Sequence, residues 1–504
     1  MMLNRGALLL SLTFIVGTAT MASQTAVAAS EPSFIIVGAR VADGTGAPLR
    51  EISVRVAKGR ILEIGALTPR VSETVVAGSG FVLAPGFIDI HNHSTSRVLD
   101  EPAATSQVSQ GITTIVVGQD GSSQLPVSSY FKSLRKTRAA VNVATCVGHA
   151  TVRRSVMGEG YKRIARPDEV ARMAAIVDRA FKEGAICLSS GLEYEVGGYA
   201  STDEIVALAR VAGRHGAFYI SHIRDEADKS IEAMTELVEI GERGKVAVQN
   251  THIKVGTASV WGKAAEVLRM FDAARQRGVD VTADCYPWEA WSSTMLVLVP
   301  NKRYDDAESV ARGLADVGGA HNVLVTSYDK DTSFEFRTLA EIAATRGLTP
   351  VALFSEMARN GGASVVVKSM MDEDIRAFYA WPWTMVSSDG GIEYRHPRGA
   401  GTFPRVLGRF VRERGWLSLE EAIRKMTSLP AWRLGLKDRG RVAAGYVADL
   451  VLFDPATVID NATFTEPFRL STGIVGVWVS GERVWEAGQS TVARPGRVLS
   501  ATRK

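Results

Sequence analysis

The feature that most constrains this chain is a regular alternation of strand-like and helical segments from residue 87 to residue 388. Short apolar runs typical of buried parallel strands recur, with amphipathic helices between several of them. The clearest helix begins at Pro167 and stops at Gly184. Eight strands can be counted, at residues 87–90, 113–117, 141–145, 185–188, 217–220, 246–248, 279–282 and 384–387. This α/β pattern predicts a TIM-like (β/α)8 barrel, with its active site at the carboxyl ends of the strands.

Both ends of the chain are rich in strand patterns without helical periodicity. They predict a small β-sandwich domain formed from both chain ends, with residues 33–84 and 441–499 as its two parts. Residues 85–440 would then form the barrel. The stretch near 296–369 is long for one strand-to-helix connection and has strand and helix patterns of its own. We therefore expect an insertion there that could cover the barrel mouth.

Residues 1–28 have the pattern of a secretory signal peptide. Arg5 supplies a positive charge, residues 7–16 an apolar core and Ala26-Val27-Ala28 a small-residue cleavage site. The apolar core is short for a membrane span, which favours a cleaved peptide over an uncleaved anchor. We expect an exported protein with no membrane attachment after cleavage, located in the periplasm if the source is a Gram-negative bacterium.

The composition is that of an ordinary globular protein, with 46% hydrophobic and 22% charged residues. The formal net charge of +4 is small and the basic residues are spread out, so no nucleic-acid-binding patch is indicated. Cys146, Cys187 and Cys285 are far apart in apolar runs. Buried packing thiols are therefore expected rather than a disulfide framework. The oligomeric state stays open.

Four histidines fall at the ends of predicted strands. His91 and His93 end the first strand, and their spacing points both side chains the same way. His222 ends the fifth strand and His252 the sixth. Because these strand ends converge in a barrel, the four imidazoles could meet around a divalent metal such as zinc. If each histidine were only packed or solvated, this common placement would be a coincidence.

Two aspartates lie at further strand ends. Asp120 follows the second strand and Asp389 the eighth, and each precedes a glycine. An aspartate in such a place is often only a turn residue or a loop cap. Beside the histidines, either carboxylate could instead ligate a metal or transfer a proton.

This constellation resembles the metal-dependent amidohydrolase superfamily, and more closely its N-acyl-D-amino-acid deacylases (D-aminoacylases). The resemblance covers essentially the whole mature chain. The metal motifs are shared across the superfamily, whereas the later motifs are more specific to the deacylases. The similar segments are residues 84–89, 108–114, 190–194, 222–226, 251–254, 285–287, 293–296, 388–390, 401–405 and 495–499.

The resemblance implies one firmly held zinc ion on His222, His252 and Asp120, with His91 and His93 serving a second site. Well-studied D-aminoacylases have a cysteine where this chain has Asp120. A carboxylate can also ligate zinc and bridge two ions, although a hard oxygen donor favours zinc less strongly over manganese or cobalt. If Asp120 is only a turn residue, Glu193 near the end of the fourth strand is the reserve carboxylate. One or two zinc ions per chain are possible.

The resemblance also implies roles around the substrate. Asp389 would act as the general acid–base that takes a proton from water and protonates the leaving amine. The residues that would bind the free carboxylate of the substrate are Lys254, Tyr286, Ser293 and Arg398. The guanidinium of Arg398 suits a carboxylate well. Surface solvation is the alternative for Lys254 and Arg398, and core packing for Tyr286.

Three more residues are noted without a firm role. His149 lies at a strand end, where packing or loop support is favoured over metal ligation. Trp288 and Trp291 could line an acyl or side-chain pocket, although aromatic residues in a covering loop need no such role.

The sequence thus predicts a zinc-dependent hydrolase that cleaves the amide bond of N-acyl-D-amino acids to a carboxylate and a free D-amino acid. An alternative is a dipeptidase or cyclic-amide hydrolase of the same superfamily that acts on peptides with a D-residue. A catalytically silent binding protein is a third hypothesis, suggested by Asp120 but opposed by the presence of all four histidines and Asp389. The preferred side chain and acyl group are not indicated.

Overall fold

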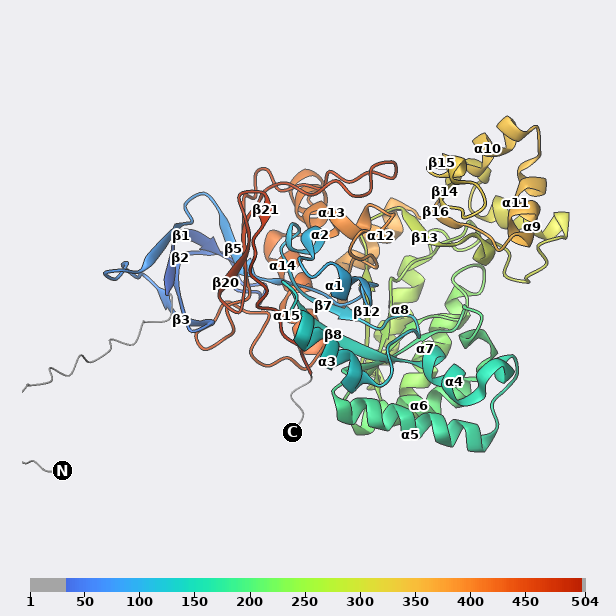
Figure 1. The fold of residues 1–504 in the computed structure, drawn as a ribbon, viewed down its shortest axis with the longest axis horizontal. Coiled ribbons are helices and arrows are strands. Elements are labelled where there is room, and N and C mark those ends of the chain that lie inside the picture. Colours follow the sequence, from blue (N-terminus) through green and yellow to red (C-terminus); the bar gives the residue numbers. More distant parts are fainter. Residues whose placement is uncertain (1–32, 501–504) are drawn as a thin grey trace, which may run out of the picture.

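The computed structural model describes residues 33–500, so the expected signal peptide lies outside the described residues. At its centre is an eight-stranded sheet (Figure 1) with the order β17-β12-β11-β10-β9-β8-β7-β6. All neighbouring strands in it are parallel. The strands are β6 (Phe87–Asp89), β7 (Ile112–Val117), β8 (Asn142–Gly148), β9 (Cys187–Gly191), β10 (Phe218–His222), β11 (Ala247–Asn250), β12 (Val281–Cys285) and β17 (Thr384–Val386). The predicted (β/α)8 barrel is confirmed.

The barrel closes where its first and last strands end. The His93 amide donates to the Gly390 carbonyl (2.7 Å), and the Asp389 amide donates to the His91 carbonyl (3.0 Å). This seam is a short two-bond junction rather than a long ladder. It places three candidate site residues on adjoining backbone.

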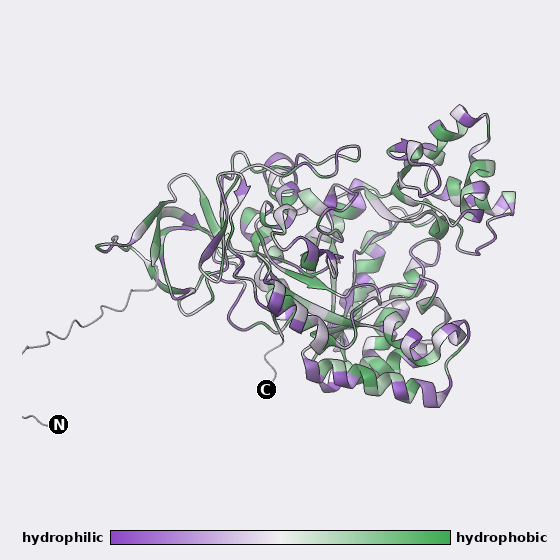
Figure 2. Cartoon of the chain, in the orientation of Figure 1, coloured by the Kyte–Doolittle hydropathy of each residue, from purple (hydrophilic) through white to green (hydrophobic). Residues whose placement is uncertain are grey.

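Amphipathic helices cover the outside of the barrel. Helix α5 begins at Pro167, buries Met173, Val177 and Phe181, and ends at Gly184. Figure 2 shows mainly hydrophobic barrel strands, whereas α5 carries both hydrophobic and hydrophilic residues. The covering helices are α3 (Val127–Thr137), α4 (His149–Met157), α5 (Pro167–Glu183), α6 (Thr202–Arg214), α7 (Ser230–Gly244), α8 (Ala264–Gln276), α12 (Asp372–Ala380) and α14 (Leu419–Met426). Within residues 33–500, we find no helix with the length and apolar character needed to span a bilayer.

The two chain ends join in one nine-stranded sheet beside the barrel (Figure 1). Its main path is β21-β20-β19-β18-β5-β1-β2-β3, and β4 pairs with β1. Phe34 of β1 stacks on Trp478 of β19, although β18 and β5 lie between these two strands in the sheet. The sheet must therefore curl to bring the two side chains together. The expected β domain from both chain ends is thus confirmed as a single curled sheet around its own core. Its strands are β1 (Phe34–Val41), β2 (Arg50–Ala57), β3 (Arg60–Gly65), β4 (Thr74–Ala77), β5 (Val82–Pro85), β18 (Leu450–Phe453), β19 (Ile474–Val479), β20 (Glu482–Glu486) and β21 (Gln489–Ser490).

A subdomain is inserted between β12 and β17 and projects away from the β domain (Figure 1). It has its own four-stranded sheet, in the order β13-β16-β14-β15, and its own hydrophobic core. Strand β13 and the following residues line the mouth of the barrel. The elements are β13 (Ala290–Thr294), α9 (Ala307–Asp316), β14 (Val323–Ser327), β15 (Arg337–Thr338), α10 (Leu339–Arg346), α11 (Pro350–Arg359) and β16 (Ser364–Lys368).

One prediction about the cysteines is wrong. Cys146 of β8 and Cys187 of β9 form a disulfide, with their Cα atoms 4.4 Å apart. The two residues are direct partners in the parallel register of these strands. The two cysteines are 41 positions apart, and strand register cannot be read over that separation, so this pairing could not be predicted from the sequence. Cys285 alone keeps a free, buried thiol.

Candidate metal centre and active site

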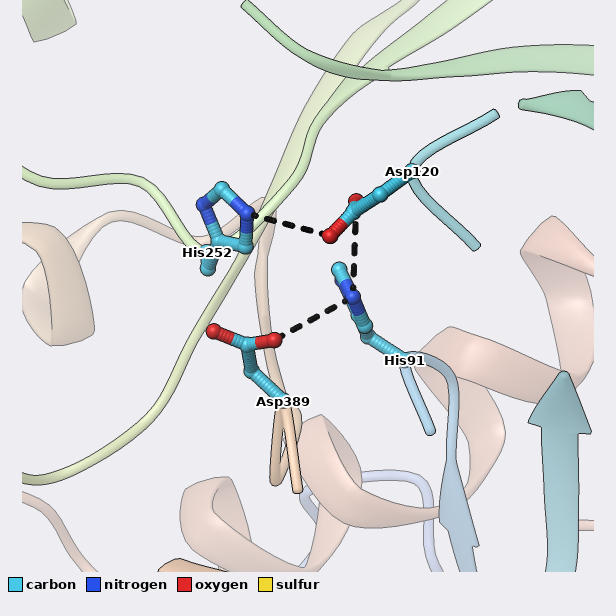
Figure 3. A group of neighbouring side chains, drawn as sticks. All are labelled: His91, Asp120, His252 and Asp389. Carbon is cyan, nitrogen blue, oxygen red and sulfur yellow. Dashed lines mark ion pairs between the residues drawn. The ribbon is translucent and has the colours of Figure 1, made fainter. Parts of the chain in front are cut away.

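Candidate ligands converge at the carboxyl ends of the barrel strands. Figure 3 shows His91, Asp120, His252 and Asp389 turned toward one another. His91 Nε2 lies 3.6 Å from an oxygen of Asp120 and 3.3 Å from one of Asp389. His252 Nε2 lies 3.9 Å from the other oxygen of Asp120. One potential ligand atom from each of the four lies within 4.8 Å of all the others, so they could hold one cation.

The remaining two predicted ligands adjoin this group. His93 Nε2 lies 3.1 Å from His91 Nε2 and 2.9 Å from Asp389 Oδ1. His222 Nδ1 lies 3.0 Å from His252 Nε2. His222, His252 and Glu226 form a second group whose ligand atoms lie within 4.8 Å. The two groups share His252, so the structure offers two adjacent positions for cations.

Three of these residues have a strained backbone. Asp120, His252 and Asp389 have φ angles of 52°, 33° and 45°, in the left-handed region that residues other than glycine seldom occupy. Such strain is typical of functional sites, where the fold fixes a side chain in an otherwise costly position. Gly118 allows the turn that carries Asp120, because a Cβ atom there would lie 2.6 Å from the Cys146 carbonyl oxygen.

Carboxylates orient two of the imidazoles from outside. Glu193 lies 2.8 Å from His222 Nε2, and Glu226 lies 3.0 Å from His252 Nδ1. These contacts leave His222 Nδ1 and His252 Nε2 to face the shared space, as in the carboxylate–histidine–metal arrangement of zinc sites. Glu193, the reserve ligand, therefore contacts His222 rather than replacing Asp120. Sequence reasoning missed the role of Glu226, whose one signal was its position four residues after His222.

Beneath the group lies a buried polar layer that sequence reasoning also missed. His91 Nδ1 makes a short contact with the hydroxyl of Thr251. Asp284 is fully buried and accepts hydrogen bonds from the His252 amide (2.9 Å) and the Ser387 hydroxyl (2.6 Å). This carboxylate ties three strand ends together. Its place inside an apolar strand gave no separate signal.

The charges in the site support one another. Burial alone would lower the pKa of His91, but Asp120 and Asp389 raise it to about 9. Burial would raise the pKa of both carboxyl groups, yet His91 and His252 hold the pKa of Asp120 below its ordinary value. Arg398, followed by the histidines, has the same effect on the pKa of Asp389. Both carboxylates are therefore ionised at neutral pH, the form that ligates metals.

Arg398 is part of the site rather than a surface residue. It is buried, and its Nη1 lies 2.7 Å from Oδ2 of Asp389. Its guanidinium carbon lies 4.7 Å from the centre of the Tyr286 ring. Tyr286 is also buried and supports Arg398 from behind, and it does not line the large cavity. Its placement fits the packing alternative as well as an indirect role in the site.

Lys254 is likewise held inside the site. Its ammonium lies 2.6 Å from Glu226 and 2.8 Å from His252 Nδ1. Ser293 of β13 lines the same cavity. Lys254 thus contacts the metal-ligand group directly, and Ser293 lines the cavity that this group shares.

Of the three residues noted without a firm role, one lines the cavity and two do not. Trp291 lines the cavity, whereas Trp288 packs against the guanidinium of Arg405 at 3.9 Å. His149 is buried away from the ligands, and its Nε2 lies 2.8 Å from Glu204. His149 therefore anchors helix α4 and does not join the site.

A cavity of about 750 Å³ opens above these residues. Such a volume suits a small substrate. Within the described residues, Oδ1 of Asp120 is buried without a hydrogen-bond partner. A cation between the imidazoles would satisfy this oxygen. The nitrogen and carboxylate donors present are ligands that zinc accepts, so the residues fit a zinc centre.

A barrel with histidines and aspartates at the carboxyl ends of its strands defines a metal-dependent hydrolase. Comparisons refine this class. The model of the amidohydrolase family matches residues 74–485. The chain is 38% identical over 502 residues to N-acyl-D-aspartate deacylase of Alcaligenes xylosoxydans xylosoxydans, covering 94% of this chain and 96% of that protein. It therefore belongs to the amidohydrolase family and to its branch of N-acyl-D-amino-acid deacylases.

Solved structures agree. N-acyl-D-glutamate deacylase from Bordetella bronchiseptica, in complex with zinc and a phosphonate mimic of the tetrahedral intermediate, matches with a TM-score of 0.85 and 34% identity. That match covers 94% of this chain and 100% of the other. A D-aminoacylase studied for its binuclear metal centre matches with a TM-score of 0.83 and 36% identity, covering 93% and 99%. The chain is a metal-dependent amide hydrolase.

Proposed function

We propose that this protein uses zinc to hydrolyse the amide bond of N-acyl-D-amino acids, releasing a carboxylate and a free D-amino acid. The ion pair between Arg398 and Asp389 is the observation that carries this proposal. It sets a carboxylate-binding guanidinium directly beside the candidate general acid–base, within reach of the metal-ligand group. Its relatives in the deacylase branch support the substrate class.

The ligands divide into two sets around Asp120. His91, His93 and Asp389 would hold one ion with it, and His222 and His252 would hold another beside it, with His252 within reach of both positions. When bound, zinc lowers the pKa of a water molecule towards 7 and polarises an amide carbonyl. Asp120 takes the place of a thiolate, so manganese or cobalt would compete better here than at a cysteine-containing site.

The chain's own residues supply proton transfer and orientation. Asp389 accepts a proton from the attacking water and passes it to the departing amine. Its ion pair with Arg398 keeps it ionised, ready to accept that proton. When the substrate carboxylate occupies Arg398, the guanidinium is shared, and Asp389 retains the proton more easily until the amine leaves. Lys254 and Ser293 complete the carboxylate site, and Tyr286 orients Arg398 from behind.

The test is amine release by zinc-loaded mature protein from matched N-acetyl-D- and N-acetyl-L-amino acids. We expect hydrolysis of the D-series only, and loss of activity in Asp389→Asn. Equal rates on both series would contradict the proposed stereochemistry. Activity only on D-residue dipeptides or cyclic amides would replace the deacylase proposal with the alternative from the same superfamily.

We also propose that the protein is exported after removal of residues 1–28. The disulfide between Cys146 and Cys187 supports this, because disulfides persist in oxidising compartments. Amino-terminal sequencing of protein from the periplasmic or extracellular fraction should begin at Ala29. Intact Met1 on protein confined to the cytosol would contradict export.

A further inference from the structure

A second cavity of about 600 Å³ adjoins the catalytic cavity at Tyr194, which lines both. The two cavities share Glu193 and Tyr194 on one wall. They also share Thr294, Val297 and Val299 from the insertion. A substituent of the substrate that extends past these shared residues would enter the second cavity.

Covalent geometry indicates which substituent this is. The α-carboxylate and the side chain of an amino acid leave the same carbon atom. With the carboxylate at Arg398 and Ser293, the side chain begins next to Thr294, the residue that follows Ser293 and lines both cavities. The acyl group lies on the far side of the scissile carbonyl. The second cavity is thus placed to receive the side chain.

Cations in the second cavity differ in whether they are already paired. Lys162 lies 2.8 Å from Glu195, and Arg224 makes two hydrogen bonds to Glu236. Lys302 also lines the cavity, and it has no carboxylate within 4.0 Å in the part of the chain that the structure describes. Lys302 is therefore the cation available to a ligand.

Each carboxylate that lines the second cavity already has a hydrogen-bond or ion-pair partner within the protein. Glu193 pairs with His222, and Asp225 accepts from backbone amides of its own loop. Glu195 pairs with Lys162 and accepts from the Tyr161 hydroxyl (2.9 Å). The direct contacts of these acids go to other groups, and Lys302 acts on Glu195 only through space, so its ammonium can still contact a bound anion.

The surroundings of Lys302 suit a short chain ending in a carboxylate. Its ammonium lies 5.5 Å from the centre of the Tyr199 ring, a contact that holds the charge over the cavity. The passage towards it is lined by Val297, Val299 and Pro300. Apolar walls accommodate methylene groups, and a cation at their end selects a negative terminus.

We propose that the second cavity is the side-chain subsite and that Lys302 selects N-acyl-D-amino acids with an anionic side chain, such as aspartate and glutamate. This inference rests on the proposed function, because it presumes that an N-acyl-D-amino acid occupies the first cavity.

The experiment compares kcat and KM for N-acetyl-D-aspartate, N-acetyl-D-glutamate and N-acetyl-D-leucine in wild type, Lys302→Met and Lys302→Arg. Arg303→Met is the matched control, since it removes an exposed positive charge one residue away that does not line the cavity. We expect wild type to prefer an acidic substrate. Lys302→Met should lower kcat/KM for that substrate by about 10- to 100-fold, mainly through KM, and leave leucine within about twofold.

Lys302→Arg should retain most of the preference, and Arg303→Met should behave as wild type. Preference of the wild type for leucine would overturn the inference, and so would equal losses on all three substrates in Lys302→Met. An effect of Arg303→Met as large as that of Lys302→Met would also overturn it. Nonspecific electrostatic attraction between the positive surface and the anionic substrate would then explain the result. Failure to hydrolyse any N-acetyl-D-amino acid would overturn the proposed function itself.

Discussion

Nη1 of Arg398 lies 2.7 Å from Oδ2 of Asp389, and both side chains are buried. This ion pair joins the proposed carboxylate-binding group to the proposed proton-transfer group. Binding of the substrate carboxylate at Arg398 is therefore coupled to the protonation state of Asp389 through this one contact. An N-acetyl amine without a carboxylate would leave Arg398 wholly with Asp389, and we expect it to be a poor substrate.

Asp389→Asn should reduce kcat by roughly 10²- to 10⁴-fold, the usual contribution of a general acid–base. Asparagine keeps the size of the side chain but cannot take the proton. Steady-state kinetics should be paired with elemental analysis, because Asp389 also adjoins His93 and His91. Hydrolysis at the wild-type rate would eliminate Asp389 as the proton carrier.

Asp120→Ala should lower the zinc content of the purified protein. The residue faces both groups of histidines, and alanine removes the oxygens that they share. Elemental analysis after dialysis against a weak chelator measures this without reference to activity. Glu193→Ala is the comparison, since Glu193 contacts His222 from outside. Unchanged zinc in Asp120→Ala, with a loss in Glu193→Ala, would transfer the ligand role to Glu193.

Glu204→Gln should destabilise the protein near neutral pH. His149 and Arg153 surround this buried carboxylate, and removing its charge leaves Arg153 buried without a counter-ion, which typically costs about 3–5 kcal/mol. Burial alone would raise the pKa of Glu204, but hydrogen bonds from these partners hold it below its ordinary value. A lowered folded-state pKa means that the stabilisation is present above the unfolded value of about 4.3 and is lost as pH falls through the folded value.

The measurement is thermal unfolding of wild type and Glu204→Gln from pH 7 downwards. The gap in Tm should be largest near pH 7 and should narrow below about pH 4. Asp168→Asn is a control in an exposed ion pair with Arg166, and it should change stability little. A gap that stays constant with pH would show that volume or packing, rather than charge, explains the loss.

Thiol counting should find one free thiol per chain in protein denatured without reductant, because only Cys285 is unpaired. Reduction before denaturation should raise the count to the three cysteines of the sequence. The change should disappear in a Cys146→Ser, Cys187→Ser double variant. Three free thiols in unreduced, exported protein would contradict the disulfide.

The barrel and the convergence of ligands could be predicted because both follow from local periodicity. Strand and helix patterns alternate along the chain, and a barrel brings its strand ends together whatever the loops contain. We could predict His91, His222 and His252 as ligands from their positions at the strand ends alone. Asp120 and Asp389 were found by the same rule.

What the sequence could not provide depends on register and side-chain direction. Cys146 and Cys187 meet because β8 and β9 pair in one register, which a shift of one residue would abolish. Glu226 contacts His252 and Lys254 only because the loop after β10 folds back over the site. No periodicity encodes such a turn, so the supporting carboxylates were harder to predict than the ligands.

The two-bond seam between β6 and β17 also constrains how the protein is made. His91 and Asp389 are separated by almost the whole barrel, and the His93–Gly390 junction brings them together. A chain still emerging from the ribosome or crossing a membrane lacks half of this junction until the last barrel strand is released. We therefore expect the complete ligand group to form late in biogenesis, and chains that end before residue 389 to lack a complete centre.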